Sequence, residues 1–123
     1  MSSPTDPDIK QALAKDKVID ITTTGARSGK PRRTEIWFYR AGGRIYITGS
    51  PGKRDWYANL LADPAFTFHL KESVSVDLPA HAVPINDEAE RRRVTSLIVG
   101  PDYDPQKFEA RIAGSPLVEV IFD

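Results

Sequence analysis

Short segments of strand composition, joined by tight turns, recur along this chain and constrain its fold more than any other feature. They cover Val18–Thr24, Thr34–Arg40, Arg44–Thr48, Phe66–Lys71, Val74–Val83 and Leu117–Phe122. In the fourth segment Phe66, Phe68 and Leu70 alternate with polar residues, as in a strand with one buried face. Gly42-Gly43 predicts a hairpin turn, because glycine accepts the positive φ that such turns need. Neighbouring short strands of this kind pair antiparallel, so the sequence predicts a mainly β (α+β) fold, with about six antiparallel strands closing into a barrel.

The segments between these strands predict two to four short helices. The helical stretches are Ile9–Lys17, Asp55–Ala62, Asn86–Val99 and Asp104–Ala113. The last three begin on good helix-capping residues, namely Asp55, Asn86 and Asp104. In the first, Leu13 is the expected main contact with the core. Since the sequence has no repeat or linker, we expect residues 9–123 to form one domain behind a flexible tail of residues 1–8.

The composition argues against several classes of protein. The chain has no cysteine, which excludes disulfides, thiolate nucleophiles and cysteine metal sites and fits a cytoplasmic location. No stretch approaches the roughly 20 apolar residues of a transmembrane helix, and the first residues lack the apolar part of a secretory signal. The two histidines, His69 and His81, are expected to be surface or hydrogen-bonded groups, and we expect no metal site.

The charge is balanced over the chain but unevenly placed. Seventeen Lys and Arg residues match seventeen Asp and Glu residues. Two loop segments are purely basic, and their cations are Arg27, Lys30, Arg32 and Arg33 in the first and Lys53 and Arg54 in the second. A neutral protein with its cations gathered in two loops is expected to attract one localised anion, and not nucleic acid. On charge alone, a solvated hairpin tip is an equal alternative.

The most informative segment, Ile21–Thr34, reads ITTTGARSGKPRRT. Its two glycines allow backbone conformations in which successive N–H groups point into one concavity. Ser28 and the threonines add hydroxyl donors, and Arg27 and Arg32 can each form a fork of hydrogen bonds to phosphate oxygens. This combination of residues favours a phosphate-binding hairpin over an ordinary turn.

At this hairpin the sequence resembles the deazaflavin (F420)-dependent nitroreductases, which are split β-barrel relatives of pyridoxamine-phosphate-oxidase-like flavin-binding proteins. The family's loop reads roughly T-T-G-x-[RK]-[ST]-G-x-x-R, and Thr23–Arg32 matches it throughout. A glycine-containing loop and a W-Y-x-N-L element follow as Gly49–Lys53 and Trp56–Leu60, and an A-x-P element as Ala62–Pro64. The matches span about Ile19–Leu70 in the expected order. The resemblance implies a split β-barrel that binds coenzyme F420 (8-hydroxy-5-deazaflavin).

The resemblance also implies which residues contact that cofactor. The residues that would hold its phosphate and the start of its polyglutamate tail are Ala26, Arg27, Ser28, Gly29, Lys30 and Arg32. The residues that would line the ring are Thr34, Glu35, Ile36 and Trp37. The residues that would close over the ring edge and ribityl chain are Thr48, Gly49, Ser50, Pro51, Lys53, Trp56, Tyr57, Asn59 and Leu60. Spacing alone assigns Trp56 and Leu60 to the core and makes Asn59 the better functional candidate.

In this family the reduced deazaflavin delivers a hydride to a small electron-poor acceptor, such as a quinone, nitroaromatic or enone. This chemistry needs mainly orientation and a dry site from the protein. The family often places several tyrosines near the C-terminus, whereas only Tyr103 lies there in this chain. Tyr103 and Tyr57 are therefore the substrate-side candidates, and no catalytic residue is assigned. The loop between Ser50 and Trp56 is also shorter than in the family.

Two alternatives and one expected partner remain. An FMN-binding split-barrel oxidoreductase is an alternative, because FMN and F420 share the phosphate and ribityl groups. A non-catalytic carrier of a deazaflavin or flavin is the other. We expect a homodimer, because alternation places Trp37 and Tyr39 on the face opposite Ile36 and Phe38, which exposes large aromatic side chains unless a partner covers them.

Overall fold

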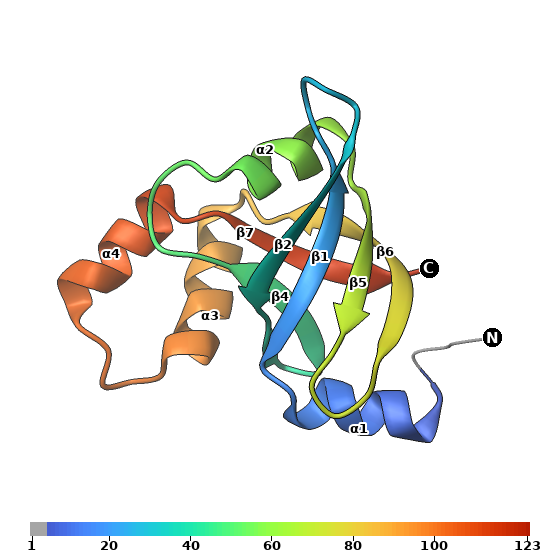
Figure 1. Ribbon diagram of the computed structural model, residues 1–123. Coiled ribbons are helices and arrows are strands. Elements are labelled where there is room, and N and C mark those ends of the chain that lie inside the picture. Colours follow the sequence, from blue (N-terminus) through green and yellow to red (C-terminus); the bar gives the residue numbers. More distant parts are fainter. Residues whose placement is uncertain (1–4) are drawn as a thin grey trace.

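A computed structural model describes residues 5–123 as one curled antiparallel sheet with four helices around it (Figure 1). The strands are β1 (Val18–Thr24), β2 (Pro31–Trp37), β3 (Tyr39–Ala41), β4 (Arg44–Thr48), β5 (Ala65–Leu70), β6 (Val76–Pro84) and β7 (Leu117–Phe122). They are hydrogen-bonded in the order β2-β1-β5-β6-β7-β4-β3. This is the α+β split barrel that the sequence predicts, with seven strands instead of about six.

The seventh strand arises because the predicted strand Thr34–Arg40 is divided at Phe38. β2 and β3 follow each other in the chain, yet they occupy opposite ends of the hydrogen-bonded order. The sheet must therefore curl until its two edges meet at this residue. The Phe38 side chain is only 2% exposed, and its N–H donates to the Lys17 carbonyl at 3.0 Å. A continuous strand was the wrong prediction here, because the pairing partner changes from β1 to β4 at this point.

The inner face of the curled sheet forms the main core. The pairing of β1 with β2 places Ile19 opposite Ile36 and Ile21 opposite Thr34, all on this face. The Phe68 ring packs edge-to-face on Phe38, with the ring centroids 5.3 Å apart, and a similar contact to Phe122 continues the cluster. The alternation read from the sequence thus identifies the buried face correctly.

Helices close the two ends of the barrel and extend one side of it (Figure 1). α1 (Pro7–Lys15) lies at the end where β1 begins, and α2 (Asp55–Ala62) lies at the opposite end beside the β1–β2 hairpin. α3 (Glu88–Val99) and α4 (Pro105–Gly114) pack together on the side, near β3 and β4. No helix among residues 5–123 is both long and apolar enough to cross a membrane.

Several element ends differ from the predicted ones. α1 begins at Pro7 behind an Asp6 cap, and Ile9 and Ala12 are its buried residues, whereas Leu13 is only partly buried. Residues 1–4 of the expected tail lie outside the described residues, whereas Pro7 and Asp8 are helical. β5 and β6 are displaced by one or two residues from the predicted ranges. These shifts leave the sheet faces unchanged.

Two of the predicted helix caps are also wrong. Asp87 caps α3, since its Oδ2 accepts from the Glu90 N–H at 3.0 Å, and Asn86 precedes it. Asp55 is the first helical residue of α2, whose cap position is Arg54 without a capping side chain. Asp104 caps α4 as predicted. Adjacent Asn, Asp and Arg residues do not fix a boundary to one residue by propensity alone.

The outer face of β2, β1 and β5 carries a network of paired charges. Asp20 accepts from Arg33 Nε at 2.9 Å and from Lys71 Nζ at 2.7 Å, and Lys71 also contacts Glu35. The hydrogen bond from Lys71 lowers the pKa of Asp20, despite the opposing effect of partial burial. His69 is buried beside this network, with hydrogen bonds that satisfy both ring nitrogens. Cross-strand pairs of this kind stabilise the sheet modestly.

The junction of the two sheet edges at Phe38 gives a direct test of the fold. We expect Phe38→Ala to lower the free energy of unfolding by about 3–5 kcal/mol, because it removes a buried ring from the junction of the two sheet edges. Urea titration at neutral pH measures this change. Leu97→Ala is the control, because Leu97 is 53% exposed on α3 and its truncation is expected to change stability by less than about 0.5 kcal/mol. Equal effects of the two substitutions would show that Phe38 does not close the barrel.

Candidate functional site

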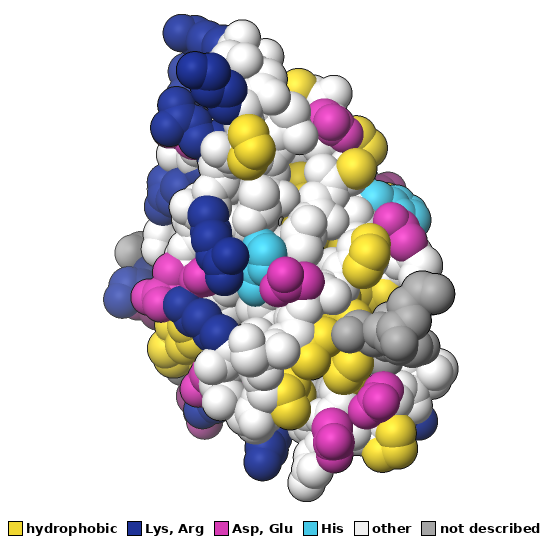
Figure 2. Space-filling model, turned by 45° about the vertical axis from the view of Figure 1, so that its right-hand side comes forward, with side chains coloured by type: hydrophobic (Ala, Val, Ile, Leu, Met, Phe, Trp, Pro, Cys, Tyr) yellow, Lys and Arg dark blue, Asp and Glu magenta, His cyan; other side chains and the backbone are white. Residues whose placement is uncertain are grey.

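A groove of about 880 Å³ separates the β1–β2 hairpin from α2. It is lined by Gly25, Ala26, Arg27, Ser28, Arg32, Arg33, Thr34, Lys53, Arg54, Asp55, Trp56, Tyr57, Ala58, Asn59 and Leu61. The hairpin projects at the top of Figure 1, and dark-blue basic side chains gather at the same end of the molecule in Figure 2. The β1–β2 hairpin and α2, which are separated in the sequence by β3, β4 and a loop, thus form a single site.

The hairpin loop is held by its own hydrogen bonds. The Gly25 N–H donates to the Lys30 carbonyl at 2.8 Å, and the Gly29 N–H donates to the Gly25 carbonyl at 2.9 Å. Ser28 Oγ accepts from the Lys30 N–H at 3.1 Å. A Cβ at Gly25 would lie 2.5 Å from Ser28 Oγ and 3.2 Å from the Lys30 carbonyl oxygen, so a side chain here would displace Ser28 Oγ from its bond to the Lys30 N–H. Gly29 has a φ of 68°, which glycine adopts without strain.

Asn59 of α2 fastens this loop to the sheet. Its Oδ1 accepts from the Ala26 N–H at 2.9 Å, and its Nδ2 donates to Thr23 Oγ1 at 3.1 Å. Thr23 is 2% exposed and Asn59 is 7% exposed, so water competes little for either bond. Both ends of the Asn59 amide are therefore occupied within the protein, and this residue positions the loop.

These bonds correct one part of the phosphate-loop hypothesis. The sequence suggests that successive loop N–H groups point into one concavity. In the structure four of these groups, on Gly25, Ala26, Gly29 and Lys30, are bonded inside the protein. Within the described residues, the loop N–H groups without an internal acceptor belong to Arg27 and Ser28. An anion at this loop would therefore be held mainly by side chains.

The cations around the groove differ in whether they are already paired. In the described part of the chain, Arg27, Arg32 and Lys53 form no ion pair, and the groove lining includes one acidic residue, Asp55. By contrast, Arg33 is bonded to Asp20 on the outer face. The N-terminal turn of α2 also lines the groove, and its dipole favours negative charge. The groove is therefore electropositive and has free hydrogen-bond donors.

The pairing of β2 with β1 places Arg32 and Arg33 on opposite faces of the sheet. Arg32 lies opposite Thr23 and Thr34 opposite Ile21, and both partners are buried on the inner face. Arg33 lies opposite Thr22 and faces outward, although it reaches the rim of the groove. Arg32 is thus directed to the groove from a backbone that the β1 ladder fixes.

Other residues of the predicted site lie outside the groove lining. They are Gly29 and Lys30 at the hairpin tip, Glu35, Ile36 and Trp37 farther along β2, Thr48 at the end of β4, Gly49, Ser50 and Pro51 after it, and Leu60 in the core. The segment after β4 is tied to the end of α4: Thr48 Oγ1 donates to the Pro116 carbonyl at 2.6 Å, and Arg111 donates to the Gly49 carbonyl. The structure therefore places this segment beside α4.

The two candidate tyrosines have different surroundings. Tyr57 lines the groove and also a second cavity between α2 and α4. Tyr103 lines neither, and its hydroxyl accepts from Arg111 Nε at 2.9 Å. Arg91 also lines the second cavity, and this position was not predicted from the sequence. No local signal could have revealed it, because its backbone partners come mainly from a distant helix end. Among residues 5–123, no three His, Asp or Glu side chains are arranged to hold a metal ion.

The Asn59 bonds predict a local effect of substitution. We expect Asn59→Ala to lower the free energy of unfolding by about 1–3 kcal/mol, because it leaves Thr23 and the Ala26 N–H without partners. Hydrogen exchange of the Ala26 amide should become faster. Asn59→Asp is the matched variant, since its carboxylate can still accept from the Ala26 N–H and from the Thr23 hydroxyl. If Asn59→Ala leaves the exchange rate of Ala26 unchanged, Asn59 does not hold the loop.

Comparison with solved structures shows the same fold in distant proteins. A conserved hypothetical protein from Mycobacterium tuberculosis is 20% identical, with a TM-score of 0.68 over 99% of this chain and 81% of that chain. A structure named F420 reductase is 19% identical, with a TM-score of 0.65 over 93% of this chain and 92% of that chain. A structure described as a domain-swapped dimer is 20% identical, with a TM-score of 0.54 over 97% of this chain and all of that chain.

The sequence itself gives a more specific assignment. Residues 3–112 match the profile of the F420H(2)-dependent quinone reductase family. The match covers most of the chain and includes both the basic hairpin and α2. The resemblance inferred from the hairpin motif is therefore confirmed, and the cofactor class it implied is that of the family. The chain belongs to the F420H(2)-dependent quinone reductases and is an oxidoreductase of the coenzyme F420 class.

Proposed function

We propose that this protein holds coenzyme F420 in the groove between the β1–β2 hairpin and α2, and reduces a small quinone-type acceptor. The observation that carries the proposal is that three cations of the groove lining, Arg27, Arg32 and Lys53, have no ion-pair partner among residues 5–123, beside a loop held by its own hydrogen bonds. A preformed loop with free cations suits a phosphate group, because little conformational entropy is lost on binding.

The residues present fit the cofactor at its phosphate end. The Gly25 turn brings Ser28 close to the loop backbone, and the Asn59 bond keeps the Ala26 backbone against α2. Arg32 from the strand and Arg27 from the hairpin loop would contact the phosphate. The inner-face residue Thr34 and the side chains of Trp56 and Tyr57 would then line the ribityl chain and ring. Lys30, at the hairpin tip, is free to meet the tail.

The reaction requires little acid–base catalysis by the side chains of this protein. The reduced deazaflavin supplies a hydride to the acceptor, and the protein's task is to orient the two and to limit water. A quinone is the acceptor class that the family suggests, and nitroaromatics and enones remain within the same proposal. We infer that residues 9–123 act as a single cofactor-binding domain, and a cytoplasmic location remains a prediction from the sequence.

Arg32 provides the test of this cofactor site. We expect Arg32→Ala to weaken F420 binding by about 2–3 kcal/mol, because one charge-assisted contact to phosphate is lost. Arg33→Ala is the matched control, because Arg33 is bonded to Asp20 on the outer face. Its effect should be much smaller. Fluorescence titration of both variants and of the parent protein with F420 and with FMN measures these affinities.

The same titrations separate the alternatives. Binding of FMN in preference to F420 would indicate an FMN-dependent oxidoreductase. Tight F420 binding without turnover of any quinone would indicate a non-catalytic carrier. If both arginine variants bind F420 as the parent protein does, the hairpin is only a charged turn and the proposed site is wrong.

A second part of the proposal is that the protein is a homodimer that covers the outer face of β2. Trp37 is 53% exposed there, and β2 is an edge strand hydrogen-bonded only to β1. A small barrel gains stability by burying such an aromatic side chain in an interface. We expect sedimentation velocity at micromolar concentration to show a dimer for the parent protein and a monomer for Trp37→Glu. A parent protein that sediments as a monomer would contradict this part of the proposal.

A further inference from the structure

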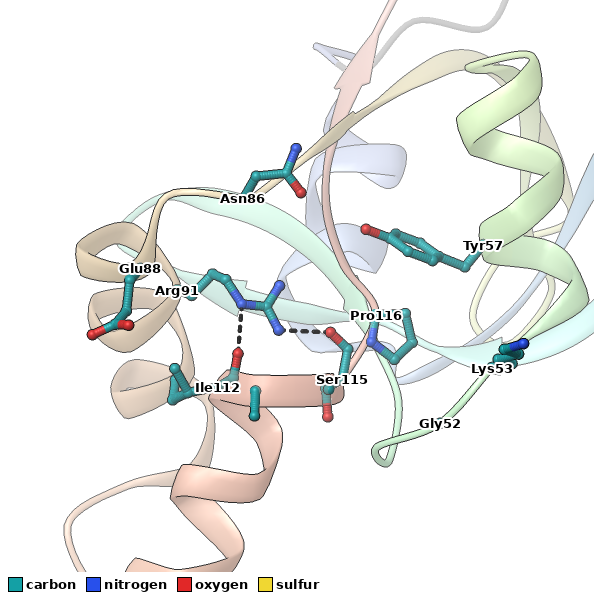
Figure 3. Close-up of a pocket in the computed structure, with 11 residues that line it drawn as sticks. Gly52, Lys53, Tyr57, Asn86, Glu88, Arg91, Ile112, Ser115 and Pro116 are labelled. Carbon is teal, nitrogen blue, oxygen red and sulfur yellow. Dashed lines mark hydrogen bonds between the residues drawn. The ribbon is translucent and has the colours of Figure 1, made fainter.

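A second cavity, of about 740 Å³, lies between α2, the start of α3 and the end of α4 (Figure 3). It is lined by Gly52, Lys53, Tyr57, Asn86, Glu88, Arg91, Ile112, Ala113, Gly114, Ser115 and Pro116. Its volume is within the usual range for small-molecule sites. Of its lining residues, the cofactor proposal uses only Lys53 and Tyr57, which this cavity shares with the groove.

Three polar side chains point into this cavity from different elements (Figure 3). Tyr57 comes from α2, Asn86 from the segment before α3, and Arg91 from α3. Within residues 5–123, the Tyr57 hydroxyl and the Asn86 amide have no hydrogen-bond partner. Their donors are therefore available to a ligand.

Arg91 is held rigidly and carries an unneutralised charge. Its guanidinium donates to four backbone carbonyls, those of Ile85, Arg111, Ile112 and Ser115, at 2.7–3.0 Å. A guanidinium has five N–H groups, so one, on Nη1, has no acceptor in the described part of the chain. No carboxylate pairs with Arg91 there. The four carbonyls fix the position of this positive charge beside the cavity.

The second cavity adjoins the cofactor groove. Lys53 and Tyr57 line both, so a molecule in the cavity and one in the groove would share these two side chains. The cavity lining has two cations, Lys53 and Arg91, and one acid, Glu88, which is already paired with Arg92. The cavity is thus next to the groove, rich in hydrogen-bond donors and net positive.

We propose that this cavity is the binding site for the hydride acceptor, and that it selects planar carbonyl compounds that carry an acidic group. Tyr57, Asn86 and the free N–H of Arg91 would donate to the acceptor's oxygen atoms, and Lys53 would favour the acidic group. This inference rests on the proposed function, because the acceptor must lie beside the cofactor.

The same donors suit the reaction as well as binding. When a quinone gains a hydride, which brings two electrons and one proton from the reduced cofactor, negative charge develops on a quinone oxygen. A second proton, from water, completes the hydroquinone. Fixed donors that face this oxygen stabilise the developing charge without having to reorient.

Direct binding of a quinone tests the proposal without the cofactor. The probe is anthraquinone-2-sulfonate, which is planar, soluble and anionic, and its affinity is measured by isothermal titration calorimetry. We expect Tyr57→Phe and Asn86→Leu each to raise the Kd by roughly 3- to 10-fold, the loss expected for one hydrogen bond. Gln106→Leu is the control, because it also removes an exposed carboxamide, but at the start of α4 and outside the cavity lining. Lys53→Gln should weaken binding of the sulfonate more than binding of uncharged menadione.

The outcomes are distinct for the two levels of proposal. If the parent protein does not bind anthraquinone-2-sulfonate, or if all variants bind it equally, the acceptor site is not in this cavity. Titration of Asn86→Leu with F420 gives a second readout: its Kd should stay within about 2-fold of the parent value, because Asn86 lines the second cavity and not the groove. A larger loss would place Asn86 in the cofactor site and overturn the assignment. Failure of the parent protein to bind F420 would instead refute the proposed function, whatever the quinone titrations show.

Discussion

The closure of the curled sheet at Phe38 is the constraint on which the remaining structure depends. The chain passes in one residue from β2 at one edge of the sheet to β3 at the other. This is possible only if the sheet curls, and the curl encloses the aromatic cluster of Phe38, Phe68 and Phe122. A barrel has two open ends, and α1 and α2 cover one each. The groove lies between α2 and the β1–β2 hairpin beside it.

Asn59 connects this scaffold to the site. Through Thr23 it is joined to the inner face of β1, and through Ala26 to the hairpin loop. The loop, the first strand and α2 therefore form one hydrogen-bonded unit. Arg91 has a comparable effect on the other side, because it binds the carbonyls at the end of α4, where a positive charge is favoured by the helix dipole. Both cavities are thus bounded by elements fixed in position.

The chain uses its basic residues in two ways. On the outer face of the sheet, Arg33 and Lys71 are paired with Asp20 and contribute modestly to stability. Around the groove, Arg27 and Arg32 have no such partners among the described residues. A protein of zero net charge can therefore present a locally positive site, since Asp55 is the one acid in the described groove lining.

The sequence by itself determined the fold class, the buried sheet face and the family. Alternation identified the inner face of β5 residue by residue, because one-sided burial imposes a period of two on any strand. The T-T-G-x-R-S-G motif identified the hairpin because glycines, hydroxyls and cations in this density are typical of a phosphate-binding turn. Only the tertiary structure decided that Asn59 is bonded to the hairpin loop and to Thr23, and that Thr48–Pro51 adjoin α4. It also decided that Arg91 is a rigid charge beside a second cavity. These features depend on contacts between residues 20–70 positions apart, and local composition has no information about which distant backbone atoms will meet a side chain.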